Sequence, residues 1–172
     1  MRSHVNVVLA RRGSVTGAAA ISMFTNPKPG HSPVLCCVGA SQPEYQPIWP
    51  PTLMMNKTTA NTPSIEKMTW GPGQLGIGQA VLDAVADGLI EATGDLIVLV
   101  ALWIDGRADD ETAVRVATRA AVRKAILATR GLKGIAGTYQ FDANGDGLHG
   151  YTIVRNEQGK LVFIRTIEFP VD

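Results

Sequence analysis

The side chains best suited to binding a polar substrate are Lys57 and Thr59, two residues apart in the segment TLMMNKTT at residues 52–59. Side chains two apart on an extended strand share a face, so the ammonium and hydroxyl groups are expected to point the same way. Gln74 follows in WGPGQLGIGQAVLDAVADG, where a predicted amphipathic helix begins. The sequence therefore predicts that a cation, a hydroxyl and an amide converge on one site.

Together with three other segments, this grouping resembles the formaldehyde-activating enzyme family. These segments are HVNVVLARRGS at residues 4–14, FTNPKPGHSPVL at 24–35 and DLIVLVALWID at 95–105. The similarity runs in order over residues 4–129, with an insertion near residues 40–51. The resemblance implies an α+β fold, a β-α-β sandwich like the second domain of ribosomal protein S5.

Enzymes of this family condense formaldehyde with tetrahydromethanopterin, which gives methylene-tetrahydromethanopterin and water. The resemblance implies a carbon-oxygen lyase of one-carbon metabolism, with the reduced pterin as co-substrate and without a metal. Loss of water from the carbinolamine needs a proton donor, and the family's proton-donating histidine falls on His4. Imidazole suits this role because its ordinary pKa of about 6.5 lets it give and recover a proton near neutrality.

The family's substrate contacts fall on Leu35, Lys57, Thr59 and Gln74, and each residue type fits. The family's acidic position two residues after the histidine holds Asn6, which also belongs to the predicted site. Asparagine can orient an imidazole or a pterin nitrogen, but it cannot neutralise a positive charge that develops during reaction. We therefore expect weakened turnover. The alternative is a non-catalytic homologue that binds or senses a pterin or formaldehyde.

The family also implies an assembly. It forms a homopentameric ring with substrate pockets between neighbouring subunits, so residues of two chains are expected to line each pocket. Family members carry a further strand before the histidine, whereas three residues precede His4. We expect either a start further upstream or an unpaired sheet edge beside the site.

Hydrophobic periodicity predicts the elements that position these residues. Residues 4–11 alternate, which predicts a strand with His4 and Asn6 on the face opposite Val5, Val7 and Leu9. Ser14 is the expected N-cap of a helix that continues through Phe24. Further strands are predicted at 33–38, 52–59 and 96–104, with a proline-rich loop at 39–51. Helices are predicted at 73–86 and from 109 onward. The second of these helices is expected to bury a stripe of Val114, Ala117, Ala121, Val122 and Ala125.

The pattern changes after residue 131, where short strands alternate with Asn-Gly, Asp-Gly and Gln-Gly turns. This tail resembles the C-terminal end of periplasmic branched-chain amino-acid-binding proteins. We therefore predict a domain at 1–130 and a β-rich appendage at 131–172, and an inactive fusion remnant is a further alternative. The segment DANGDG imitates half a calcium loop, but Ile153 stands where a carboxylate is required, so a turn is predicted.

Composition gives no general attraction to nucleic acid or to an anionic membrane, because 16 Lys and Arg face 15 Asp and Glu. Apolar runs are too short for a membrane helix and no signal core opens the chain, so a cytoplasmic location is expected. Cys36 and Cys37 are neighbours, which makes a disulfide between them improbable, and the spacing of a metal site is absent. Two small buried side chains are expected there.

The remaining histidines and two tryptophans are assigned no role in the site. His31 lies in a Pro-Gly turn and His149 in the tail, and both are expected in surface loops. Trp70 and Trp103 are expected to pack in the core or an interface.

Overall fold

The computed structural model describes residues 3–27, 31–40, 43–58 and 62–129 with their side chains, and beyond residue 129 only the backbone of the strands named below. The chain forms two compact units, residues 1–127 and 128–172, and each is treated by itself. Within the described residues, we find no helix that is both long enough and apolar enough to cross a membrane.

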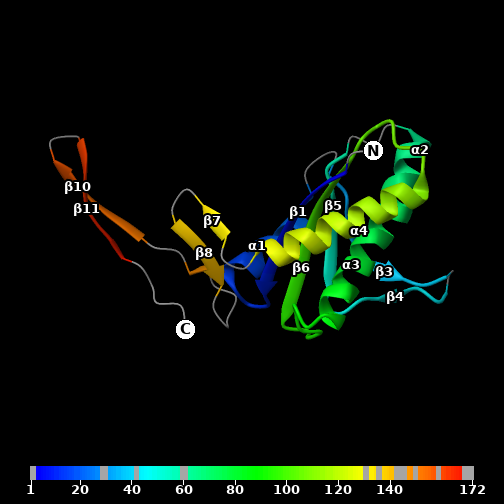
Figure 1. The fold of residues 1–172 in the computed structure, drawn as a ribbon, viewed down its shortest axis with the longest axis horizontal. Helices are drawn as coiled ribbons and strands as arrows, with labels where there is room; N and C mark the ends of the chain where they lie inside the picture. Colours follow the sequence, from blue (N-terminus) through cyan, green and yellow to red (C-terminus); the bar gives the residue numbers. More distant parts are fainter. Residues whose placement is uncertain are drawn as a thin grey trace. The chain divides into compact units, whose positions relative to one another are not determined.

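The first unit is built on a four-stranded sheet with the order β1-β6-β5-β2 (Figure 1). These strands are β1 (Ser3–Arg11), β2 (Pro33–Leu35), β5 (Thr52–Asn56) and β6 (Leu96–Ile104). The central strand β6 runs antiparallel to β1 and parallel to β5, and β2 runs antiparallel to β5. Strand β1 is therefore one edge of the sheet. With the helices described next, this mixed sheet confirms the predicted α+β class.

The helices of this unit are α1 (Val15–Thr25), α2 (Pro63–Met68), the π-helix η1 (Thr69–Gly73), α3 (Gln74–Ala86) and α4 (Glu111–Ala128). Two predicted helix boundaries are confirmed. The Ser14 hydroxyl accepts a hydrogen bond from the Gly17 N–H at 3.0 Å and caps α1. Gly88 follows α3 with a φ of 67°, a left-handed conformation that favours glycine.

Helix α2 and the π-helix were not predicted. The sequence does carry a start signal, because Thr62 caps α2 with its side chain and Pro63 occupies the first turn. Pro72 lies inside the π-helix, and its missing N–H is compatible with a locally widened helical ladder. The amphipathic helix that begins at Gln74 is thus the last part of a longer helical segment.

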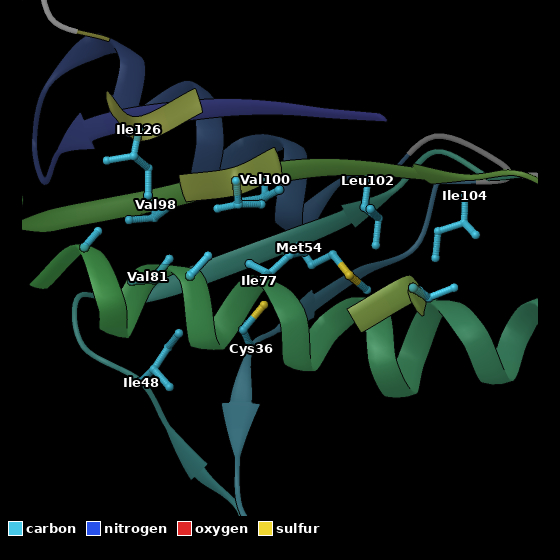
Figure 2. Packing of buried hydrophobic residues seen from close by; sticks show 14 of the residues in the cluster. Cys36, Ile48, Met54, Ile77, Val81, Val98, Val100, Leu102, Ile104 and Ile126 are labelled. Atoms are coloured by element: carbon cyan, nitrogen blue, oxygen red, sulfur yellow. The ribbon is translucent and has the colours of Figure 1, made fainter. Parts of the chain in front are cut away.

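The sheet is covered differently on its two faces. On one face, α3 and α4 pack against alternate residues of the strands, including Met54, Val98 and Val100 (Figure 2). On the other face, Ala20 and Phe24 of α1 pack against a smaller cluster that contains Leu53, Met55, Ile97 and Leu99. Successive side chains of each strand therefore point alternately into the layer of α3 and α4 and into the layer of α1.

The buried stripe of α4 differs from the prediction. The buried residues are Val114, Thr118, Val122 and Ile126, spaced four apart. The predicted Ala117, Ala121 and Ala125 are only half-buried. A polar threonine was not expected in the stripe, and its burial follows from a close approach of α3 and α4 that is described below.

The predicted strand at 33–38 is interrupted. Strand β2 ends at Leu35, and Cys37–Val38 forms β3, which pairs with β4 (Gln46–Pro47) in a separate two-stranded sheet. The proline-rich loop at 39–51 therefore contains a short strand. Proline is tolerated there because a two-stranded sheet leaves one side of each strand unpaired.

Beyond the end of α4, the described backbone of the second unit consists of strands. Strands β7 (Leu132–Gly134), β8 (Gly137–Phe141) and β9 (Gly147–Leu148) pair in order, and β10 (Tyr151–Glu157) pairs with β11 (Lys160–Ile167). Short paired strands agree with the pattern of turns in the sequence. The calcium-like segment at 142–146 lies outside the described residues.

Candidate functional site

Strand β1 presents His4 and Asn6 on one face because its other face is held by the core. Val5, Val7 and Leu9 pack against the cluster under α3 and α4. Since successive side chains of a strand alternate, His4 and Asn6 must point away from that cluster, and both are exposed. The predicted orientation of this strand is confirmed.

A row of three side chains crosses the sheet on this same face. The Cα of His4 is paired with that of Trp103 on β6. The Lys57 N–H donates to the Leu102 carbonyl at 2.7 Å, which continues the parallel β5–β6 register and places Lys57 beside Trp103. Two strand spacings separate His4 from Lys57, about 10 Å between Cα atoms. His4, Trp103 and Lys57 form what we call the site row.

The direction of Lys57 is fixed by its two neighbours. The Asn56 side chain accepts from the Thr58 N–H at 2.8 Å and donates to the Thr58 carbonyl at 3.1 Å. The Thr58 hydroxyl accepts from the Ile104 N–H at 2.8 Å. Both neighbours are buried, while Lys57 is exposed. Because Asn56 and Thr58 face the buried side, the Lys57 side chain leaves the backbone on the opposite face, which is the face of the site row.

A second group of predicted residues lines a cavity of about 560 Å³. Gln74 begins α3, and its side-chain amide donates to the Cys37 carbonyl at 2.6 Å. Leu35 lies at the end of β2 and is 38% exposed. Trp70 and Tyr45 also line this cavity, and so do Glu111 and Arg115 at the start of α4. A cavity of this size, with aromatic walls and a few polar groups, is typical of small-molecule sites.

Within one chain, the predicted site residues fall into two groups. The site row and Asn6 lie on the sheet face that α1 partly covers, and Gln74 lies in the layer of α3 on the other face. The expectation that Lys57 and Gln74 converge is therefore not met within a single chain. Thr59 lies outside the described residues. The reason is topological: the chain crosses from one face of the sheet to the other between β5 and α3.

Sequence reasoning left both tryptophans out of the site, and the structure places each of them near one of the two groups. Trp103 is 39% exposed within the site row, and Trp70 is 37% exposed at the cavity. Neither ring is buried in the core of the unit. The sequence carried no signal for Trp103, because residues 96–104 form a continuous apolar run, and its exposure became visible only in the structure, where its neighbours Leu102 and Ile104 are buried.

The cysteines have unequal environments. Cys36 is fully buried, and burial, together with the neighbouring Cys37, raises the pKa of its thiol to about 12. Such a thiol stays protonated near neutrality and is a poor nucleophile. Cys37 is only half-buried, so the expectation of two buried side chains holds for Cys36 alone. Among the residues with described side chains, no cluster of three or more His, Cys, Asp or Glu could hold a metal ion.

Comparison with known proteins adds to this geometry. Residues 1–135 match the profile of the formaldehyde-activating enzyme family. The chain is 33% identical over 114 residues to a 5,6,7,8-tetrahydromethanopterin hydro-lyase of Methanosarcina barkeri, which covers 65% of this chain and 62% of that protein. It is 27% identical over 159 residues to a bifunctional enzyme Fae/Hps of Methanocella arvoryzae, which covers 89% of this chain and 39% of that protein.

The family match includes both groups of predicted residues, since His4, Lys57 and Gln74 all lie within the matched range. The match covers well over half of the 172 residues, although the chain spans less than two thirds of each of these two relatives. The chain belongs to the formaldehyde-activating enzyme family.

Proposed function

We propose that this protein condenses formaldehyde with tetrahydromethanopterin to give methylene-tetrahydromethanopterin and water. Membership of the family supports the proposal, as does the printed activity of the Methanosarcina barkeri relative, a tetrahydromethanopterin hydro-lyase. The observation that carries it is the site row, which sets the His4 imidazole and the Lys57 ammonium on one exposed face of a rigid sheet. Groups held by strands keep their geometry during a reaction.

In this proposal His4 is the proton donor. An amine of the pterin adds to the aldehyde carbon, and the resulting hydroxyl leaves as water after it takes a proton from His4. The second pterin nitrogen then closes the ring, and a proton returns to the imidazole. Asn6, Leu35, Lys57, Thr59 and Gln74 are proposed to contact the substrates.

A second copy of the chain completes the site in this proposal. Gln74 lies in a different layer from His4 and Lys57, in the cavity that Leu35 also lines. If the cavity of one subunit faces the site row of the next, the two groups meet across an interface. The homopentamer is therefore part of the proposal. A cytoplasmic location is proposed with it.

The experiment follows methylene-tetrahydromethanopterin formation above the spontaneous rate. The wild type should accelerate the reaction, and His4→Ala should lower kcat by about a hundredfold or more, the usual contribution of a general acid. His149→Gln, outside the family match, serves as a control and should leave kcat unchanged. A wild-type rate equal to that of the protein-free mixture would reject the proposal.

Asn6 favours a second candidate, a homologue that holds the pterin or a formaldehyde adduct without turnover. An amide beside His4 supplies no negative charge to a developing cation. Calorimetry separates the two candidates, because this one predicts binding of tetrahydromethanopterin by a protein with no measurable rate. Absence of binding would remove it.

A further inference from the structure

Helices α3 and α4 are joined by a regular ladder of side chains. Arg119 donates two hydrogen bonds to the Asp83 carboxylate, at 2.6 and 2.7 Å. One turn further along, Arg123 donates to Asp87 at 2.5 Å. One turn earlier, Arg115 donates to the side-chain oxygen of Gln79 at 3.0 Å. The spacing of four residues on both helices makes these pairs successive rungs.

The first rung differs from the others in charge. Asp83 and Asp87 neutralise their arginines, whereas the Gln79 amide carries no charge and leaves the positive charge of Arg115 in place. Within the fully described residues, no carboxylate forms an ion pair with Arg115. The nearby Glu111 is paired with Lys67 at 2.5 Å.

This uncompensated arginine is also the one that lines the cavity. Arg115 lies on its wall with Gln74, Leu35 and Trp70, whereas Arg119 and Arg123 do not line it. A guanidinium presents five N–H donors in a planar fork, and a single bond to Gln79 leaves donors for a second, anionic partner. The cavity thus combines an aromatic wall, a fixed amide, the Arg115 guanidinium and the Glu111 carboxylate, and this carboxylate is already paired with Lys67.

We propose that this cavity binds an anionic group, a carboxylate or a phosphate, carried by the planar substrate, and that Arg115 is the residue that binds it. The inference rests on the proposed function, because it makes the acidic part of the pterin substrate the ligand of Arg115. The neutral Gln79 is what leaves Arg115 available. Specificity for an acidic carrier over an uncharged pterin follows from this arrangement.

Two variants and a control test the inference. Arg115→Gln removes the cation. Gln79→Glu keeps the guanidinium but supplies the carboxylate that the other rungs have, so it should occupy Arg115 internally. Arg123→Gln removes an arginine of the same ladder that does not line the cavity. A merely structural role for Arg115 predicts that Gln79→Glu has no effect on ligand binding.

The first measurement is calorimetric titration with tetrahydromethanopterin. Arg115→Gln should raise Kd by about tenfold, as expected for one charged hydrogen-bonding partner. Gln79→Glu should raise Kd in the same direction, and Arg123→Gln should leave it unchanged. Added salt should weaken binding to the wild type more than binding to Arg115→Gln, because it screens the lost interaction.

The second measurement needs no pterin. Inorganic phosphate and glutarate are titrated separately while the indole N–H signal of Trp70 is followed by NMR, and the response to each distinguishes a phosphate from a carboxylate ligand. The signal should shift in the wild type and in Arg123→Gln, but not in Arg115→Gln.

The outcomes separate this inference from the proposed function. A wild type that binds phosphate or glutarate through Arg115 but forms no methylene-pterin retains the anion site and loses the proposed function. A wild type that turns over, with Arg115→Gln and Gln79→Glu binding both probes like the wild type, retains the function and overturns the inference.

Discussion

The Cα of His4 stands directly opposite that of Trp103 across the antiparallel β1–β6 pair. Residues paired in this way point to the same face, so Trp103, on the middle strand, lies between His4 and Lys57 on that face. The ring is 39% exposed and is the apolar member of an otherwise polar row. We expect a flat substrate that reaches both polar groups to lie against this ring.

Trp103 is therefore predicted to stack against the pterin. Trp103→Ala should raise KM for tetrahydromethanopterin by about five- to tenfold, since it removes an aromatic contact together with buried apolar area. Trp103→Phe should keep most of the affinity. Trp49→Phe is the control, because Trp49 is 52% exposed and does not belong to the site row. Equal KM values for Trp103→Ala and the wild type would contradict this role.

Asn6 is predicted to limit the rate. Its side chain shares a face with His4, two residues along β1, and is exposed. A carboxylate there would stabilise positive charge that develops at the imidazole or the substrate, so Asn6→Asp should raise kcat by about tenfold or more. Asn6→Ala provides the comparison without charge.

The measurement is the initial rate at saturating formaldehyde and pterin. If Asn6→Asp and Asn6→Ala share one rate, charge at this position has no part in the reaction.

Gly76 is predicted to set the distance between α3 and α4. A Cβ placed there would come within 2.6 Å of the Arg115 carbonyl oxygen and 3.1 Å of the Thr118 Cβ. This close approach is the reason that Thr118 is buried. Gly76→Ala should destabilise the protein by about 2 kcal/mol, because the backbone of α4 must move away.

Urea denaturation measures this effect, and Gly106→Ala is the matched control, because a Cβ at Gly106 would meet open space. The same displacement moves Arg115, so Gly76→Ala should also weaken pterin binding. Equal stability of the two alanine variants would show that the helices tolerate the added methyl group.

The Asp83–Arg119 rung is predicted to make stability depend on acid pH. The hydrogen bonds from Arg119 hold the pKa of the Asp83 carboxyl below its ordinary value. A carboxyl with a lowered folded pKa stabilises the fold above its unfolded pKa, about 3.9, and this contribution is lost as the pH falls through the folded value. Asp83→Asn should therefore lower Tm by a few degrees at pH 7.

Thermal unfolding of both proteins between pH 7 and pH 2.5 provides the check. The difference in Tm should be constant down to about pH 4 and should shrink below it. A difference that persists unchanged at the lowest pH would mean that packing, and not the charge of Asp83, accounts for the effect.

Local pattern was sufficient to predict most of the elements near the site. Alternation in residues 4–11 predicted which side chains β1 buries, and the run at 96–104 predicted β6 with its observed bounds. Ser14 and Gly88 marked helix ends because capping and left-handed turns depend on residues close in sequence. Resemblance to the family supplied the chemistry, and the family match supports it.

The sequence by itself determined the strands β1 and β6, the main helices, the family and the candidate side chains His4, Lys57 and Gln74, whereas it merged β2 with β3 and extended β5 beyond Asn56. Only the tertiary structure decided that Gln74 lies in a different layer from His4 and Lys57, that Trp103 stands between those two, and that Arg115 faces a neutral partner. The physical reason is that side-chain direction follows from local periodicity, whereas strand order, register and helix packing depend on contacts between residues far apart in the chain.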